Sequence, residues 1–291
     1  MIAVIGSQGF IGKRLVEFLR QQNQSVVEYS SKAGNLINSN HELVDDFTLP
    51  ENCSTIIFLS QSPNYRYFPD KYEELIKINS LLPFSVCKKA IEKKVQRMIY
   101  FSTGSVYTHS VKPIFESNQL NRESSYPLSK IFAEESLSLL SSSIQICSIR
   151  PFTMFGPGQS NMLIPNLTSS ILKGQPVTLD KLDGQESAEG LRISLMYVED
   201  VVRAVYQLIQ AESLPRAINL ASPISMTIKE IATVIGEATS RNVNFNIKDL
   251  PRRGDLIADI TLLSKYYKSE YLNFRKYISN YAQIALAEKK P

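Results

Sequence analysis

The 291-residue sequence is poor in the residues that bind transition metals or form disulfides, with three cysteines and two histidines. The cysteines are odd in number and lie in or beside apolar runs, which is typical of reduced thiols in a cytoplasmic protein. Neither histidine has a cysteine or a carboxylate at the spacing of a metal site. We therefore expect no disulfide framework and no bound metal. The residues concerned are Cys53, Cys87, Cys147, His41 and His109.

Two further features are missing, a strong charge of one sign and a long apolar run. The net charge is +4, from 32 basic and 28 acidic residues that are mostly interleaved along the chain. Such a surface argues against a nucleic-acid interface, although it would still accept an anionic substrate. No stretch approaches the ~18 consecutive apolar residues of a membrane span. The sequence predicts a cytoplasmic protein with neither nucleic acid nor a membrane as its partner.

What the sequence does contain is an alternation of short apolar runs with helical patterns. The runs have the length of buried strands, and the patterns between them repeat with helical periodicity. This alternation indicates an α/β fold, in which helices cover both faces of a Rossmann-type, doubly wound parallel sheet. The strand-like runs are residues 2–5, 25–29, 55–60, 97–102 and 144–150, and the helical patterns are residues 71–93 and 126–141.

After the fifth run the pattern changes, because a turn rich in proline and glycine is followed by a new series of helical and strand-like runs. We expect residues 1–155 to form a core that binds NAD(P). Residues near 195–222 should return to this core, with 218–220 as a further strand of its sheet. The remaining segments, 156–194 and 223–291, are expected to form a smaller α/β lobe that binds the substrate.

Three glycines, Gly6, Gly9 and Gly12, follow the first apolar run and precede a helical pattern. Their GxxGxxG spacing differs from the GxGxxG fingerprint, but the physical task is similar. A loop with either spacing makes a tight turn, lets the backbone approach a pyrophosphate closely, and directs a helix N-terminus at its charge. Phe10 and Ile11 lie in the same loop. The sequence therefore predicts a dinucleotide-binding loop.

The end of the second apolar run bears on the choice between NAD and NADP. An acidic residue at this place would bind the adenosine ribose hydroxyls of NAD. If Ser30 holds the place, no carboxylate repels a 2′-phosphate, and Ser31 and Lys32 are available to bind one, which favours NADP. Side chains alternate along a strand, so Glu28 faces the same way as Ser30, and a strand ending two residues earlier would restore the carboxylate of an NAD enzyme.

Tyr126 and Lys130 are four residues apart in a helical pattern, so they share one face of the helix. An ordinary phenol titrates near pH ~10, and a neighbouring ammonium would lower the pKa of Tyr126 toward a value suited to proton exchange. A tyrosine and a lysine on the surface of an ordinary helix would show the same spacing. The rest of the chain separates the two interpretations, above all the segment STGSVY at residues 102–107.

Several segments, in order along the chain, resemble one family of enzymes. The stretch RPFTMFGPGQ at residues 150–159 is similar to the family pattern RPFNVYGPGQ, with Thr153 in place of the usual asparagine. The chain resembles, essentially end to end, the extended short-chain dehydrogenase/reductase family, the NAD-dependent epimerase/dehydratase group that acts on nucleotide sugars. The other similar segments are Asp46-Phe47, residues 57–61, which resemble the family's fourth strand, residues 197–202 (YVEDVV) and residues 252–255 (RRGD).

The resemblance implies roles for individual residues. Thr103, Tyr126 and Lys130 correspond to the catalytic set, in which Thr103 would orient the reacting sugar oxygen, Tyr126 would exchange its proton, and Lys130 would also hold the nicotinamide ribose. The implied substrate is a nucleotide-diphosphate sugar, and the implied assembly is a homodimer through the helical patterns at 71–93 and 126–141. The cofactor-binding positions are Gly6, Gly9, Phe10, Ile11, Gly12, Ser30, Ser31, Lys32, Asp46, Phe47, Leu59, Ser60, Gln61, Tyr126, Lys130, Pro151, Phe152 and Thr153. The substrate-binding positions are Ser105, Asn161, Arg192 and Arg252.

Two departures from the family pattern bear on the reaction. Dehydratases and decarboxylases of the family usually carry acidic residues after the catalytic threonine, whereas this chain has Gly104 and Ser105. Elimination needs a second acid or base, and this segment of the chain does not provide one. The reactions that remain are those at a single carbinol or ketone. At the position where the family has an arginine that binds the diphosphate, this chain has Ile193. Arg192 is one place away and would therefore lie on the opposite face of a strand. Arg252 matches the family's other phosphate-binding arginine.

Three functions follow from these observations. We expect an NADPH-dependent reductase of a nucleotide-diphospho-4-keto-6-deoxyhexose. The alternative enzyme is an NAD-dependent nucleotide-sugar 4-epimerase, and the third hypothesis is a non-catalytic relative that binds NADP. Such relatives commonly lose the catalytic tyrosine or lysine, and this chain keeps both, which weighs against the third hypothesis.

Overall fold

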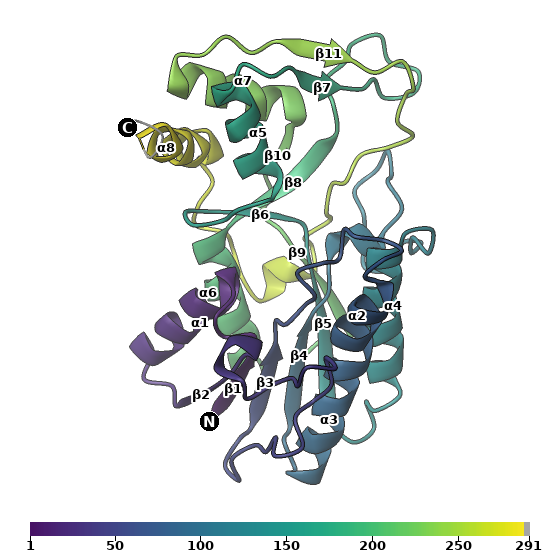
Figure 1. Ribbon diagram of the computed structural model, residues 1–291, viewed down its shortest axis with the longest axis vertical. Coiled ribbons are helices and arrows are strands. Elements are labelled where there is room, and N and C mark those ends of the chain that lie inside the picture. Colours follow the sequence, from purple (N-terminus) through teal and green to yellow (C-terminus); the bar gives the residue numbers. More distant parts are fainter. Residues whose placement is uncertain (288–291) are drawn as a thin grey trace. The chain divides into compact units, whose positions relative to one another are not determined.

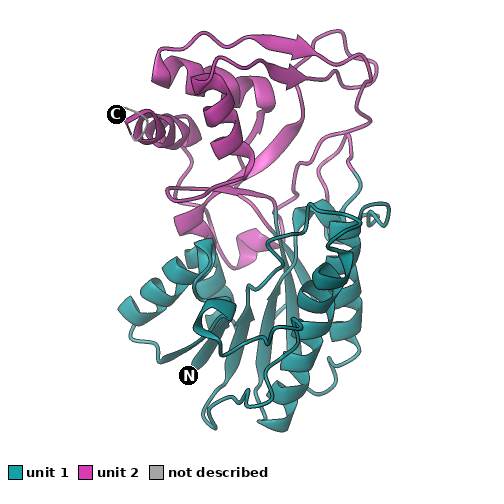
Figure 2. Cartoon of the chain, in the orientation of Figure 1, with its two compact units in different colours: residues 1–108, 116–151, 202–219 teal, residues 109–115, 152–201, 220–291 magenta. Residues whose placement is uncertain are grey.

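The computed structural model describes residues 1–287, which form two compact units (Figure 2). Unit 1 contains residues 1–108, 116–151 and 202–219. Unit 2 contains residues 109–115, 152–201 and those from 220 on. Among the helices of residues 1–287, none has the length and apolar character that crossing a membrane requires.

Unit 1 is built on a six-stranded sheet with the order β2-β1-β3-β4-β5-β9. The pairings that join β1 to β2, β1 to β3, β3 to β4 and β4 to β5 are all parallel. The predicted Rossmann-type sheet is therefore confirmed, and the last strand returns to it from far along the chain. The strands are β1 (Ile2–Ile5), β2 (Val26–Tyr29), β3 (Thr55–Phe58), β4 (Arg97–Phe101), β5 (Gln145–Pro151) and β9 (Ala217–Leu220).

Helices cover both faces of this sheet (Figure 1). On one face α1 (Phe10–Gln21) packs beside α6 (Val198–Gln210), with the rings of Phe18 and Tyr206 meeting edge to face at 5.6 Å. On the other face lie α2 (Tyr72–Ile76), α3 (Leu82–Glu92) and α4 (Ser125–Ser138), with a π-helical turn (Lys77–Leu81) between the first two. Because both faces are covered, all four residues of β1 and of β3 are buried, as in other parallel sheets.

The connection from β2 to β3 contains no further strand of the sheet, only a single bridge between Ile37 and Leu43. For this reason β2 forms one edge of the sheet. The segment that resembles the family's fourth strand, residues 57–61, begins in the third strand of this chain and continues into the loop after it.

Up to residue 287, unit 2 has two smaller sheets packed with the α-helices α5, α7 and α8. One sheet has the order β10-β8-β6, with an antiparallel and a parallel pairing, and the other pairs β11 with β7 in parallel. Its core includes Phe155, Ile193, Leu195, Ile231 and Phe274, all nearly inaccessible to solvent. The elements are β6 (Thr153–Phe155), α5 (Leu163–Leu172), β7 (Val177–Leu179), β8 (Arg192–Tyr197), β10 (Ser225–Thr227), α7 (Ile228–Thr239), β11 (Phe245–Ile247) and α8 (Phe274–Ala287).

A buried carboxylate anchors the segment that precedes α8. Asp200 is fully buried at the start of α6 and accepts hydrogen bonds from the hydroxyls of Tyr267 and Ser269. The backbone amides of Glu270 and Tyr271 donate to the same carboxylate at 3.2 Å. Four donors therefore compensate the buried charge, as burial of an ionised group requires.

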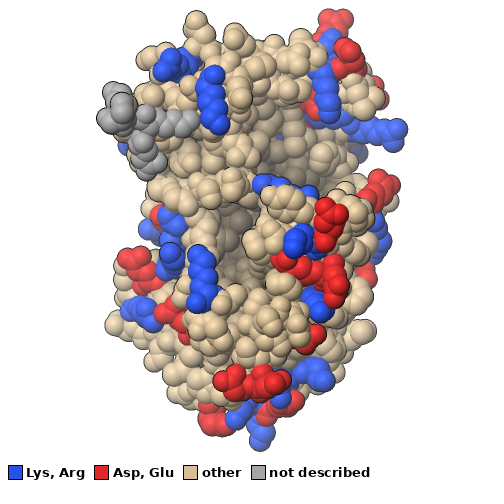
Figure 3. Space-filling view, viewed as in Figure 1, with Lys and Arg blue, Asp and Glu red and all other residues tan. Residues whose placement is uncertain are grey.

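The surface charges are mixed in sign. On the face shown in Figure 3, basic and acidic side chains lie interspersed among neutral ones. This distribution agrees with the interleaved charges of the sequence and with the absence of a large single-sign patch on that face.

Candidate active site

The glycine loop lies between β1 and α1 and packs tightly against itself and its neighbours. Gly6 has φ +88°, a conformation that L side chains rarely adopt, and a Cβ there would lie 2.8 Å from the backbone nitrogen of Ser60. A Cβ on Gly12 would lie 2.2 Å from the carbonyl oxygen of Gly6. Glycine is therefore required at both positions for the backbone to take this path.

The N-terminus of α1 has the features of an anion site. Gly9 is the N-cap residue and provides no side-chain hydrogen bond, and the first turn contains no acidic residue. The orphan amides of this turn, together with the helix dipole, suit a pyrophosphate group. Phe10 and Ile11 are half-buried in the same turn. The loop therefore fits the dinucleotide that the sequence predicts.

The end of β2 presents a serine where an NAD enzyme of this fold would present a carboxylate. Ser30 is buried just after the strand, its hydroxyl accepts from the amide of Ala33 at 3.1 Å, and its amide donates to Asn35 at 2.9 Å. Glu28 lies within β2 and binds the guanidinium of Arg20 at 2.7 Å. The strand thus ends at Tyr29, and the position that follows is neutral.

Other predicted cofactor residues lie around this strand. Ser31 and Lys32 are exposed in the turn after Ser30. Asp46 is exposed, whereas the ring of Phe47 is part of the core and lies 4.8 Å from the ring of Tyr29. The side chain of Phe47 therefore has a packing role in addition to any contact its backbone makes with a ligand.

Thr103, Tyr126 and Lys130 come from two elements of unit 1. Thr103 follows β4 and caps a 3-10 turn (Gly104–Val106), where its hydroxyl accepts from the amide of Ser105 at 3.1 Å. Tyr126 and Lys130 are on α4. A hydrogen bond joins the Thr103 hydroxyl to the Tyr126 phenol. The structure therefore brings the predicted hydroxyl and phenol together.

Lys130 is almost completely buried, and its surroundings differ from the prediction. Its Nζ donates to the carbonyl oxygen of Phe101 at 2.9 Å and lies 5.1 Å from the ring centroid of Tyr100. Burial lowers the pKa of Lys130 to about 7, although the nearby carboxylate of Glu134 raises it. At neutral pH the side chain is close to its own titration midpoint.

The predicted effect of Lys130 on Tyr126 is wrong in this structure. Burial raises the pKa of Tyr126 well above its ordinary value. The hydrogen bond with Thr103 lowers this pKa, but it offsets only part of the effect of burial. The cation that lowers it is Arg66. The physical reason is that low polarity around α4 disfavours both the phenolate and the ammonium, so the two groups are both shifted toward their neutral forms.

The loop from Gln61 to Arg66, which follows β3, also contacts Tyr126. Of its residues, only Gln61 was predicted from the sequence to belong to the site. The phenol donates to Oε1 of Gln61 at 3.2 Å, and the ring of Tyr65 lies 4.6 Å from the ring of Tyr126. The guanidinium of Arg66 lies 4.9 Å from the centroid of the Tyr65 ring. The signal that could have revealed these residues is the run of aromatic and basic residues at 65–68 (YRYF), which is separated by three residues from the segment at residues 57–61.

One buried polar atom near the site has no partner. Ser102 Oγ, next to Thr103, is buried without a hydrogen-bond partner in the part of the chain that the structure describes. A buried hydroxyl without a partner is costly, so a ligand that donates or accepts there would be stabilised.

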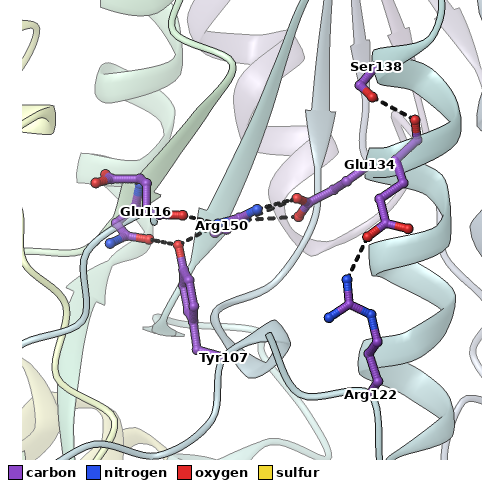
Figure 4. A network of polar contacts seen from close by, with 8 residues as sticks. Tyr107, Glu116, Arg122, Glu134, Ser138 and Arg150 are labelled. Carbon is purple, nitrogen blue, oxygen red and sulfur yellow. Dashed lines mark hydrogen bonds and ion pairs between the residues drawn. The ribbon is translucent and has the colours of Figure 1, made fainter. Parts of the chain in front are cut away.

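A network of polar side chains joins α4 to β5 and to the segments that contain Tyr107 and Glu116 (Figure 4). Arg150, at the end of β5, donates to both carboxylate oxygens of Glu134 at 2.5–3.1 Å, and to the hydroxyl of Tyr107 at 2.7 Å. It also donates to the carbonyl oxygen of Glu116 at 2.9 Å, and Tyr107 donates to Asn219 at 2.7 Å. The arginine of the RPFTMFGPGQ segment is therefore a structural residue that joins β5 to α4.

The predicted substrate-binding arginines lie in unit 2 and already bind carboxylates. Arg252 binds Asp180 and Asp255 at 3.0 Å each, with its side chain 9% exposed. Arg192 lies on β8 and is 3.5 Å from a carboxylate oxygen of Glu230, while its backbone amide donates to Asp255 at 2.8 Å. A phosphate would have to compete with these carboxylates, so the roles of both arginines stay predictions.

The remaining predicted residues lie as follows. Ile193 is in the core of unit 2, and its neighbour Arg192 is half-buried at the start of β8. Ser105 is exposed. The last group is Pro151 at the end of β5, buried Phe152, half-buried Thr153 at the start of β6, Asn161 with φ +55° in the loop before α5, and Leu59 and Ser60, both half-buried after β3.

Comparison with known proteins decides the family. The model of the NAD dependent epimerase/dehydratase family matches residues 2–221. The chain belongs to this family. The match confirms the resemblance drawn from the sequence segments, and it spans the whole of the parallel sheet described above.

Individual members of the family resemble the chain over most of its length. An uncharacterized UDP-glucose epimerase of Bacillus subtilis (strain 168) is 24% identical over 279 residues, covering 85% of each chain. The dTDP-4-dehydro-6-deoxyglucose reductase of Escherichia coli is 25% identical over 267 residues, covering 80% of each chain. A solved UDP-glucuronic acid 4-epimerase of Bacillus cereus, in complex with UDP-glucuronic acid and NAD, has a TM-score of 0.80 and 21% identity, with coverage of 98% of this chain and 99% of that one. This family protein therefore shares the Rossmann fold of such enzymes.

Proposed function

We propose that this protein is an NADPH-dependent reductase of a nucleotide-diphospho-4-keto-6-deoxyhexose. The observation that carries the proposal is the hydrogen bond between Thr103 and Tyr126, on a phenol whose pKa is raised by burial. A phenol with a raised pKa stays protonated at neutral pH. It can therefore act as a general acid toward a ketone oxygen, whereas a general base would have to lose its proton first.

In the proposed reaction, the sugar ketone gains a hydride at carbon 4 and a proton at oxygen 4. A bound nicotinamide would supply the hydride. The Thr103 hydroxyl would hold the ketone oxygen by a hydrogen bond, and Tyr126 would donate its phenolic proton to that oxygen as the carbinol forms. In this structure Lys130 donates to the carbonyl oxygen of Phe101 at 2.9 Å, so the role proposed for it is to hold the nicotinamide ribose.

The residues after Thr103 also favour reduction over elimination. Gly104 is buried and Ser105 is exposed in the 3-10 turn, so this turn brings no carboxylate to the site. Elimination across a carbon–carbon bond needs a second acid or base. The E. coli relative is a reductase of a 4-dehydro-6-deoxy sugar nucleotide, which supports the same choice.

NADP is the proposed cofactor because of the residues at the end of β2. Ser30 replaces the carboxylate that would repel a 2′-phosphate, and the only carboxylate of that strand, Glu28, binds Arg20 at 2.7 Å. Lys32 is exposed two residues beyond Ser30. The expected measurement is a Kd for NADPH at least about tenfold below that for NADH, which corresponds to roughly 1.4 kcal/mol.

The second candidate is an NAD-dependent nucleotide-sugar 4-epimerase. The B. subtilis relative is named as a UDP-glucose epimerase, and the B. cereus structure contains NAD. An epimerase regenerates its cofactor in each cycle, so it should purify with nucleotide bound and turn over without added coenzyme. A reductase should consume NADPH in equal amount to its product.

The deciding experiment is a panel of dTDP-, CDP-, GDP- and UDP-sugars, incubated with and without NADPH and analysed by NMR. Oxidation of NADPH with formation of a 4-hydroxy sugar supports the reductase. Tyr126→Phe should lower kcat by at least about a hundredfold, the scale of general acid catalysis. If Tyr126→Phe turns over every accepted sugar as fast as the wild type, the catalytic assignment fails and a non-catalytic NADP-binding protein becomes the better account.

A homodimer is the proposed assembly. Apolar side chains on the α3 and α4 side of unit 1 are exposed: Leu81 is 48%, Phe132 49% and Leu139 81% accessible. A pairing of two copies through these helices would bury them. Sedimentation of the wild type and of Phe132→Asp tests this, because the variant should shift the protein toward the monomer.

A further inference from the structure

The loop after β3 contacts the Tyr126 phenol from two sides. The amide oxygen of Gln61 accepts the phenolic hydrogen bond at 3.2 Å, and the Tyr65 ring lies 4.6 Å from the Tyr126 ring at an interplanar angle of 40°. Arg66 places its guanidinium 4.9 Å from the centroid of the Tyr65 ring, on this same stack. The segment from Gln61 to Arg66 therefore contacts both the hydroxyl and the ring of Tyr126, and it brings a cation close to them.

Buried polar contacts fix this loop to α2. The carboxylate of Glu74 accepts from the hydroxyl of Ser62 at 2.7 Å and from the amide of Asn64 at 3.0 and 3.1 Å. Burial raises the pKa of Glu74, but the hydrogen bonds from Ser62 and Asn64, together with the nearby His41 and Lys71, bring it below its ordinary value. The charged carboxylate therefore persists at neutral pH and holds the loop.

The same loop is tied to the backbone of Tyr126 itself. Asn79 accepts from the amide of Ser62 at 2.8 Å and donates to the hydroxyl of Ser129 at 3.1 Å. Ser129 in turn donates to the carbonyl oxygen of Tyr126 at 2.7 Å. A chain of hydrogen bonds thus links the loop to the turn of α4 that carries the phenol.

We propose that the loop from Gln61 to Arg66 is a positioning element for the Tyr126 phenol in the proposed reductase. Gln61 and Tyr65 fix the direction of the hydroxyl, and the Arg66 guanidinium stabilises the phenolate that forms when the proton is given to the sugar. The inference rests on the proposed function, because it needs Tyr126 as the acid. It goes further in assigning a role to three residues of one loop.

The physical argument concerns the proton of the phenol. Before substrate binds, this proton is held by Gln61, and a ketone oxygen must replace that acceptor with little reorientation. After transfer, the negative phenolate faces Thr103, Tyr65 and Arg66, with Lys130 one turn further along α4. The effect of Arg66 is to lower the pKa of Tyr126, and that of Tyr65 is to raise it. The cation therefore offsets part of the effect of burial.

The test compares kcat and KM for the preferred substrate across a set of loop variants. Gln61→Ala and Tyr65→Leu should each lower kcat about tenfold with KM changed less than about twofold, because misplacement of the acid affects the chemical step. Tyr65→Phe keeps the ring and should retain most of the rate. Arg66→Ala should lower kcat, and Arg66→Lys should restore part of it.

Further readouts separate positioning from loss of structure. The solvent deuterium isotope effect on kcat should increase in Gln61→Ala, since proton transfer becomes slower relative to other steps. Tyr67→Leu changes an aromatic residue that directly follows the loop and is 63% exposed, and Arg122→Ala removes an exposed arginine that pairs with Glu135. Both controls should keep the wild-type kcat and isotope effect.

The outcomes distinguish this inference from the proposed function. If Tyr126→Phe is inactive while the Gln61, Tyr65 and Arg66 variants keep kcat within about twofold of wild type, the loop has no positioning role and the reductase assignment stands. If Tyr126→Phe keeps full turnover, both fail together, since the loop then has no acid to position. Equal losses in the loop variants and the two controls would also overturn the inference.

Discussion

Replacement of Arg150 by methionine should strongly destabilise the protein. The side chains of Arg150 and Glu134 are 7% and 8% exposed, so the pair is a buried one. Methionine has a similar length but provides no donor. The variant would leave the Glu134 carboxylate, a lone pair of Tyr107 and the carbonyl oxygen of Glu116 without the donors they have in Figure 4.

The expected magnitude comes from the asymmetry of buried ion pairs. Removal of one partner leaves a buried charge without compensation, which costs about 3–5 kcal/mol. An exposed pair such as Arg122 with Glu135 is worth about 0–1 kcal/mol, so Arg122→Met is the matched control. Replacement of both partners, in Arg150→Met with Glu134→Leu, removes both charges and should cost less than the two single changes added together, by at least about 2 kcal/mol.

The assay is urea unfolding followed by circular dichroism, with Arg150→Met, Glu134→Leu, the double variant and the control compared at one pH. The sequence has no tryptophan, so helical signal is a better probe than fluorescence. A loss below about 1 kcal/mol for Arg150→Met would refute the reasoning, because it would mean that the carboxylate finds compensation elsewhere. Additive single effects would refute it as well, since the coupling would then be absent.

Two further predictions concern the lysine and the glycine loop. Folding lowers the pKa of Lys130 to about 7 from the ordinary 10.5. Between these two pH values the unfolded chain therefore binds more protons than the folded one. Across this window, the free energy of unfolding of the wild type should rise with pH, relative to that of Lys130→Met, by up to ~1.4 kcal/mol per pH unit. Urea unfolding at several pH values measures this difference, and a difference that does not change with pH would contradict it. Gly12→Ala places a Cβ 2.2 Å from the Gly6 carbonyl oxygen, so the glycine loop must shift. Calorimetry should then show that the Kd for NADPH is raised at least about tenfold. An unchanged Kd would show that the loop does not hold the cofactor.

The parts of the fold that the sequence could predict depend on local patterns. The apolar run at residues 2–5, the glycine loop and the following helix were predictable because each signal lies within about 20 residues. The return of residues 218–220 to the first sheet was also predicted, and they form β9 beside β5. The i, i+4 spacing correctly placed Tyr126 and Lys130 on one helix, α4.

The surroundings of these side chains could not be predicted in the same way, because they depend on contacts distant in sequence. Lys130 was expected to act on the phenol, but its ammonium bonds to the carbonyl oxygen of Phe101, 29 residues away. Arg252 was expected to be ready for a phosphate, but it binds Asp180, 72 residues away. No periodicity in the sequence reports which carboxylate or carbonyl a charged side chain will meet.

The contacts of Glu134 connect the stability of α4 to the chemistry proposed for it. Glu134 lies one helical turn after Lys130 and raises the pKa of that lysine, yet burial keeps the value at about 7. The same carboxylate is bound by Arg150, which joins α4 to β5. The lysine is left close to its titration midpoint at neutral pH. A side chain in that state can take up or release a proton at little cost.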